Sequence, residues 1–200
     1  MTAALGAGLA ALVACCLGRL ASQAAAEIYG VPYRSGTGAW WYAAAIACCA
    51  CVASRHPVRA FELVPAIVAV AIGAGSDLAS GFVFDLPLAF VAGAMAVRAV
   101  SFGDPMLLSI GAGATATPLL VLYLLSGGRA MGLGDVKLAA VIGAALGPVR
   151  GCVALWVALV LAGYAGALLL LCGRVRRGAT MPFAPALAVG TWIAVLGAIA

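Results

Sequence analysis

The stretch that decides the fold is residues 152–172, CVALWVALVLAGYAGALLLLC, which contains no charged side chain. A helix needs about 20 mostly apolar residues to cross the hydrocarbon core of a bilayer, and this stretch has that length. The whole sequence is similar, because 66% of its 200 residues are hydrophobic and only 8% are charged. A soluble chain carries about 25% charged residues. The composition therefore predicts a protein surrounded by lipid and excludes a secreted, cytosolic or nuclear protein.

Polar and turn-forming breaks divide the sequence into about eight apolar segments. Backbone groups in lipid must be bonded within a helix or a closed barrel. The segments are rich in Ala and Leu and lack the alternation of barrel strands, so we expect helices. The sequence predicts an all-α polytopic membrane protein, with about eight (six to eight) transmembrane helices in one domain, residues 1–200. The expected segments are 3–20, 39–53, 61–76, 86–100, 106–125, 136–147, 152–172 and 184–200.

Three further features limit the class of protein. Residues 1–20 have no basic stretch ahead of their apolar run, so we expect a retained span and not a cleaved signal. The seven cysteines lie in or beside apolar runs and His56 is the one histidine, so we expect no metal and no cofactor. The basic residues are scattered over short loops, which indicates contact with lipid headgroups and no nucleic-acid partner.

Loop charges predict the orientation. With eight crossings, the odd-numbered loops and their edges carry seven basic residues and the even-numbered loops carry four. The first set is Arg19, Arg34, Arg129, Lys137, Arg174, Arg176 and Arg177, and the second is Arg55, Arg59, Arg98 and Arg150. The positive-inside rule then puts the odd-numbered loops in the cytoplasm. Asp77, in the third loop, and Asp135, in the fifth, are expected at this cytoplasmic face.

The chain has four aspartates, and two of them have ordinary structural explanations. Asp104 lies in a Gly-Asp-Pro turn, and Asp85 begins a segment as a helix cap would. Asp77 ends one apolar run and Asp135 begins another. A carboxylate in a membrane segment costs about 2.5–3.5 kcal/mol, so it usually faces a cavity, a partner or a substrate. Asp77 and Asp135 are therefore the candidate functional residues.

Two carboxylates that meet across helix ends repel each other and can share one proton. The ionised one can take a proton from water while the neutral one donates to a peptide carbonyl, which is aspartyl proteolysis. Gly132 and Gly134, just before Asp135, allow a close approach of the backbone to another chain. From spacing alone, ion or proton transport through paired aspartates fits nearly as well.

Residues 132–137, GLGDVK, resemble the G-x-G-D-x-K signature of type IV prepilin peptidases, the membrane aspartyl proteases that remove prepilin leader peptides. Residues 182–190, PFAPALAVG, are similar to the P-F-x-P-x-L-x-x-G segment of that family. Residues 77–85 resemble its D-x(6)-P-[DN] stretch, except that Phe84 stands where the family has Pro. The three motifs occur in the family's order, and the resemblance covers about residues 61–200.

The resemblance implies a GxGD aspartyl protease fold in which Asp77 and Asp135 are catalytic. It implies that five further residues position the motifs or the substrate: Gly132, Gly134, Lys137, Pro182 and Pro185. The expected substrate is a prepilin or pseudopilin precursor with a short basic leader and an apolar helix. The cut is expected at the junction of the two, typically after Gly, at the cytoplasmic face of the cell membrane.

One departure from the family limits the expected chemistry. Many bacterial members carry a methyltransferase insert with paired C-x-x-C motifs after the first helix. The loop expected at about residues 21–38 contains no Cys. We therefore expect peptidase activity without N-methylation, and the oligomeric state stays open.

Two other classes of protein share part of the pattern. A protease of the presenilin or signal-peptide-peptidase type would explain residues 132–135 and the Pro-Ala-Leu at 185–187. That class expects Tyr before its first aspartate, where this chain has Ser76. A small transporter with paired aspartates would place Asp77 and Asp135 near the middle of the bilayer, whereas both are predicted at helix ends.

Overall fold

The computed structural model describes residues 2–32, 39–102, 105–129, 131–176 and 181–197, and every regular element in these ranges is an α-helix. The helices are α1 (Thr2–Ile28), α2 (Ala39–Arg55), α3 (Pro57–Ser80), α4 (Asp85–Phe102), α5 (Pro105–Ser126), α6 (Leu133–Leu171) and α7 (Ala184–Gly197). The prediction of an all-helical chain is confirmed for the described residues. Arg34, Asp104 and Arg177 lie outside them.

Four helical stretches of the described residues are long and apolar enough to cross a membrane, judged by length and composition. They are Gly8–Ile28, Leu63–Ser80, Pro105–Ser126 and Leu133–Leu171. α7 is apolar but shorter. The expected membrane character of the chain agrees with these four stretches, and the number of crossings stays a prediction.

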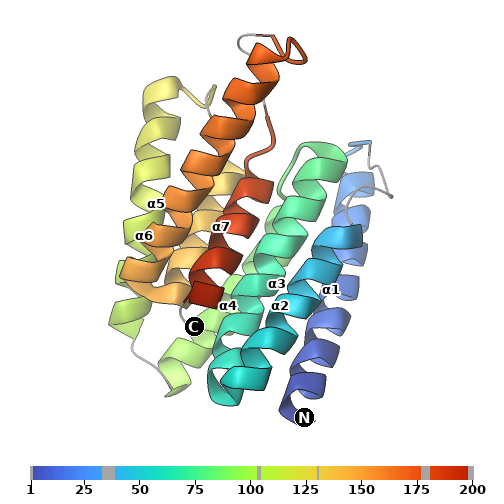
Figure 1. Cartoon of the computed structure of the whole chain (residues 1–200), viewed down its shortest axis with the longest axis vertical. Helices are drawn as coiled ribbons and strands as arrows, with labels where there is room; N and C mark the ends of the chain where they lie inside the picture. The colour runs from blue at the N-terminus through green and yellow to red at the C-terminus, as the bar shows by residue number, and fades with distance from the viewer. Residues whose placement is uncertain (1, 33–38, 103–104, 130, 177–180, 198–200) are drawn as a thin grey trace.

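α3 is the central helix of the bundle. It contacts α1, α2, α4, α6 and α7, and Figure 1 shows α1 and α2 on one side of it and α5 and α6 on the other. Residues 66–72 of α3 are all buried. Ile67 and Val70 are fully buried there, together with Leu138 of α6 and Leu187 of α7. α3, which carries Asp77 in its last turn, thus packs against other helices over most of its surface.

α6 reverses direction at Gly147. This glycine has φ 77° and ψ 173°, a conformation that L side chains rarely adopt, and Pro148 follows it. A Cβ on Gly151 would lie 2.9 Å from Cα of Gly143, although eight residues of continuous helix would separate them by about 12 Å. The expected segments 136–147 and 152–172 therefore form the two arms of a helical hairpin, visible in Figure 1.

Small residues let the arms of this hairpin pack closely on their neighbours. Gly111 of α5 meets the backbone of Gly143 directly, and Gly190 of α7 meets the backbone of Ala154. Thr115 of α5 donates a hydrogen bond from Oγ1 to the carbonyl oxygen of Ala139, at 2.7 Å. Close contacts of this kind are the usual way in which helices associate in lipid.

Two expected boundaries are wrong. α1 continues to Ile28, so residues 21–28 are helical and do not begin a loop. This extension is rich in Ala, and Ser22 bonds back to the carbonyl of Gly18 at 2.8 Å, which satisfies its hydroxyl within the helix. α3 continues to Ser80, so Asp77 lies in its last turn and not in a loop. Gly81, at φ 75°, ends the helix with an N–H bond to the Asp77 carbonyl oxygen at 2.7 Å.

Candidate active site

The two candidate carboxylates lie at the ends of two neighbouring helices. Asp77 is in the last turn of α3 and Asp135 is in the first turn of α6. Each has only 8% of its surface exposed. The two helices that carry them, α3 and α6, contact each other. The structure thus brings together the two aspartates that the sequence singled out.

A close contact between α3 and α6 accounts for this arrangement. Gly73 lies about one turn before Asp77, and Leu138 lies about one turn after Asp135. A Cβ on Gly73 would lie 2.9 Å from Cδ2 of Leu138, so glycine leaves the space that this leucine occupies. The helix axes therefore approach each other just beyond the carboxylates.

Gly132 and Gly134, the two glycines of the GLGDVK motif, have different structural roles. Gly132 is the residue before α6, with extended φ −79° and ψ 146°, and Asp135 donates its backbone N–H to the Gly132 carbonyl at 3.2 Å. A Cβ on Gly134 would lie 2.8 Å from Cβ of Val83. Gly134 therefore lets the loop 81–84, which follows Asp77, pack against the start of α6.

The segment that precedes α7 supplies a hydrogen bond to Asp77. The backbone N–H of Ala184 donates to Oδ2 of Asp77 at 3.1 Å. Pro182 is exposed two residues before Ala184, and Pro185 is the second residue of α7, where proline is well tolerated. The two prolines thus lie on either side of the amide that binds Asp77.

Asp135 keeps one oxygen without a partner. Its Oδ1 atom is buried and accepts no hydrogen bond within the described part of the chain. Most buried polar atoms in proteins have a partner, because an unpaired one costs free energy. An unpaired carboxylate oxygen beside a second carboxylate is the arrangement expected of a site that receives a polar group from a substrate.

Lys137 does not face Asp135. Its Nζ atom forms an ion pair with Oδ1 of Asp85, 2.7 Å away, and the two side chains are 43% and 64% exposed. This pair joins the first turns of α6 and α4, and it therefore attaches the end of the loop 81–84 at Asp85 to α6. No sequence pattern predicts this pairing, because the two residues are 52 positions apart.

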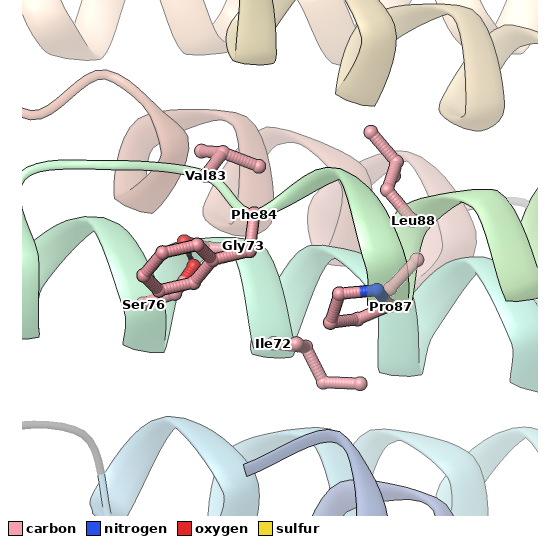
Figure 2. A pocket seen from close by; sticks show the side chains of 8 residues that line it. Ile72, Gly73, Ser76, Val83, Phe84, Pro87 and Leu88 are labelled. Atoms are coloured by element: carbon pink, nitrogen blue, oxygen red, sulfur yellow. Dashed lines mark hydrogen bonds between the residues drawn. The ribbon is translucent and has the colours of Figure 1, made fainter. Parts of the chain in front are cut away.

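A small cavity lies behind the carboxylates, between α3 and the start of α4. Its lining residues are Ala69, Ile72, Gly73, Ser76, Val83, Phe84, Pro87 and Leu88. Figure 2 shows Val83 and Leu88 on one side of α3, and Ile72 and Pro87 on the side of α1. Phe84, at the position where Pro was expected, is buried and stacks on Tyr29 with ring centroids 6.4 Å apart. This contact attaches the loop 81–84 to the end of α1.

Acidic, His and Cys side chains do not form a metal cluster in the ranges that the structure describes. Cys48 and Cys51 on α2 have C-x-x-C spacing, and both are free thiols. The chain matches no protein-family model, no curated protein and no solved structure. What supports a function is therefore the geometry of Asp77 and Asp135 and the motifs in which they occur.

Proposed function

We propose that this protein is a membrane aspartic endopeptidase that removes a short basic leader from prepilin-like or pseudopilin-like precursors. The observation that carries this proposal is the juxtaposition of Asp77 and Asp135, two buried carboxylates from separate helices. Both lie at one end of the bundle, within a few residues of a helix terminus. A precursor whose apolar helix lies in the membrane presents its leader junction at such a depth.

The proposed chemistry is hydrolysis of a peptide bond by a carboxylate pair that shares one proton. One carboxylate takes a proton from water, and the water oxygen bonds to the carbonyl carbon. The other carboxyl group donates its proton to the carbonyl oxygen. When the tetrahedral species collapses, the C–N bond breaks, the carboxyl group that took the water proton gives it to the leaving nitrogen, and the other carboxylate takes back a proton from a hydroxyl group. The products are the leader acid and the new amino terminus, and one water is consumed.

The surroundings of the pair suit these tasks. The Ala184 N–H fixes the direction of the Asp77 carboxylate. The unpaired Oδ1 of Asp135 is available to the carbonyl or to the water. Gly134 allows the loop 81–84 to approach and limits the space above the pair. In this proposal residues 132–137 and 182–185 position the carboxylates, and the site faces the cytoplasm as the loop charges predict.

A transporter with paired aspartates is the alternative class. Transport requires a path that continues from the carboxylates to the opposite side of the membrane. Asp77 lies three residues before the end of α3, and Asp135 is the third residue of α6. Placement of both groups near one end supports a site that works at one face.

The test is coexpression of the chain with a precursor that has a basic leader and one apolar helix, followed by a gel assay for loss of the leader. We expect that Asp77→Asn and Asp135→Asn each abolish cleavage. Asp104→Asn is the matched control, because Asp104 belongs to a Gly-Asp-Pro sequence outside the three motifs, and it should retain most activity. Full cleavage by Asp77→Asn or by Asp135→Asn would exclude the carboxylate mechanism.

A further inference from the structure

α5 and α6 continue beyond the neighbouring helices α3 and α7 at the end of the bundle where the two aspartates lie, as Figure 1 shows. A hydrogen bond places Thr115 of α5 beside Ala139 of α6. Leu119 follows Thr115 by one turn, and Asp135 precedes Ala139 by one turn. Because α5 and the first arm of α6 are antiparallel, Leu119 and Asp135 lie at about the same level. From this level α5 continues to Ser126, which is about 10 Å further at 1.5 Å per residue.

The second arm of α6 extends at least as far. Gly151 of this arm packs against Gly143 of the first arm. Asp135 lies eight residues before Gly143, so the residue level with Asp135 on the antiparallel second arm is Leu159. From Leu159 the helix continues to Leu171, which is about 18 Å further. Both helices therefore end well beyond the carboxylates.

These two extensions, residues 120–126 of α5 and 160–171 of α6, are apolar and are exposed on every side. None of their residues is charged, and none is buried. Leu125 and Leu171, near the tips, have 82% and 86% of their surface exposed. A helix that is apolar all round is stable in a protein core or in lipid, and not in water. Because the bundle does not cover the two extensions, they need an apolar surrounding.

The residues that follow the extensions indicate that this surrounding is a lipid leaflet. Arg129 lies three residues beyond α5, Arg174 and Arg176 lie three and five residues beyond α6, and all three are exposed. Arginines at such positions match the phosphates of lipid headgroups. α5 has 22 residues, which is about 33 Å and close to the thickness of one hydrocarbon layer. A folded protein partner would cover one face of these helices, whereas lipid surrounds them on all sides.

Polar structure lies at about the same depth as the aspartates. The loop 81–84 is not helical, and the side chains of the ion pair Lys137–Asp85 are 43% and 64% exposed. Lys137 begins about 3 Å further from the tips than Asp135, since it lies two residues further into α6. Non-helical backbone and charged side chains occur at membrane depth only where protein buries them or water reaches them. Since the ion pair is exposed, water must extend down to it.

We propose that the two extensions contact the acyl chains of one leaflet, so that Asp77 and Asp135 lie about 10 Å below its headgroups and water reaches them along the loop 81–84. This placement does not depend on the reaction that the aspartates perform. In the peptidase proposed above, the peptide bond must enter the leaflet to be cut. The water that hydrolysis consumes then arrives from the side of Lys137 and not through the lipid.

The depth is measured with a fluorescent coumarin amino acid placed at one exposed position of α5 at a time: Leu125, Leu120 or Met106. The chain is reconstituted in phosphatidylcholine vesicles whose acyl chains carry bromine, a quencher, either near the headgroup or near the methyl end. We expect Leu125 to be shallow and Leu120 to lie about 7.5 Å deeper, since five residues of helix separate them. Met106, at the other end of α5, should be shallow in the opposite leaflet.

The contrary arrangement puts the membrane surface at the level of the aspartates, with the two extensions in water. Leu125 would then be quenched by dissolved iodide and not by brominated lipid, and Met106 would lie about 10 Å deep. Either result would overturn the proposal. The three positions are exposed on the surface of the bundle, so the added side chain does not disturb its packing.

Water at the ion pair is tested on the unmodified chain, because Lys137 is its one lysine. Vesicles that contain the protein are treated on both sides with a membrane-impermeant amine reagent, a sulfonated succinimidyl ester, and labelling of Lys137 is measured by mass spectrometry. We expect nearly the same labelling in vesicles as in detergent. Loss of the label in vesicles, with labelling retained in detergent, would show that lipid covers the pair and would refute the path for water.

Discussion

Nζ of Lys137 lies 2.7 Å from Oδ1 of Asp85, which joins the first turn of α6 to the first turn of α4. Both residues flank the candidate site, since Lys137 follows Asp135 by two positions and Asp85 follows Asp77 by eight. The ion pair closes the loop 81–84 over Gly134. Lys137, which was expected to act on Asp135 or on the substrate, therefore holds the loop 81–84 that covers the site.

We expect the Lys137–Asp85 pair to contribute little to stability, because both side chains are about half exposed. Exposed ion pairs are typically worth about 0.2–1 kcal/mol. A double-mutant cycle with Lys137→Ala and Asp85→Ala, followed by thermal unfolding in detergent, measures this coupling.

The same pair can be tested by cleavage assays. The charge-swapped chain with Lys137→Asp and Asp85→Lys should recover part of the cleavage activity that the single Ala variants lose. No recovery would indicate that Lys137 acts on the substrate and not through Asp85.

Replacement of Gly134 by Ala should disturb the site. The new Cβ would lie 2.8 Å from Cβ of Val83, so the loop 81–84 must move. Overpacking of this kind typically costs about 1–3 kcal/mol, and we expect cleavage to fall with it. Gly113→Ala on α5 is the control, because a Cβ there meets nothing within 4 Å. Val83→Gly in the Gly134→Ala chain should restore part of the activity, and a failure to do so would assign the loss to another contact.

Replacement of Ala184 by Pro should weaken the site without removing α7. Proline is accepted in the first turn of a helix, but it has no N–H to donate to Asp77. Loss of a hydrogen bond to a charged group costs about 1.5–3 kcal/mol. Cleavage kinetics should therefore show a loss for Ala184→Pro and near-normal rates for Ala184→Gly, which keeps the amide. Similar rates for both variants would contradict a role for this amide.

The hairpin in α6 should depend on Gly147. With φ 77° and ψ 173°, an alanine there would be strained by about 1–3 kcal/mol. We expect Gly147→Ala to lower the unfolding temperature in detergent. Gly163→Ala, in the second arm of the same hairpin and with open space around its Cβ, should be neutral. An unchanged unfolding temperature for Gly147→Ala would argue against the reversal at this position.

The hydrogen bond of Thr115 between α5 and α6 should be measurable. Its Oγ1 atom donates to the Ala139 carbonyl at 2.7 Å, and interhelical bonds of this type in membranes average about 0.6 kcal/mol with a maximum near 1.7. Thr115→Val removes the hydroxyl and keeps the shape. Thr191→Val removes only a bond within α7, from Oγ1 to the Leu187 carbonyl. Thermal unfolding should therefore show a larger loss for Thr115→Val.

The apolar segments could be located from the sequence because charged and turn-forming residues separate them. The boundary between the sixth and seventh segments was placed correctly, since Gly147 and Pro148 both disfavour a continuous helix. The end of α1 could not be found in this way. Residues 21–28 include Ser22 and Glu27, and polar residues end an apolar pattern without ending a helix.

The candidate site was only partly accessible to sequence reasoning. Asp77 and Asp135 were found because a carboxylate in an apolar segment needs an explanation. The Ala184 amide was missed, because every residue except proline has a backbone N–H and no sequence pattern marks the one that binds. The ion pair of Lys137 with Asp85 was missed for a different reason. The packing of α4 against α6 brings the two residues together, and the sequence alone does not show this packing.

The hydrogen bond from Ala184 to Asp77 has a consequence for biosynthesis. It joins residues 107 positions apart, and its donor belongs to the final helix of the bundle. While the chain is still emerging from the ribosome, both aspartates are in place long before their partner is made. In the proposed peptidase, the site would therefore be complete only after α7 docks on α3.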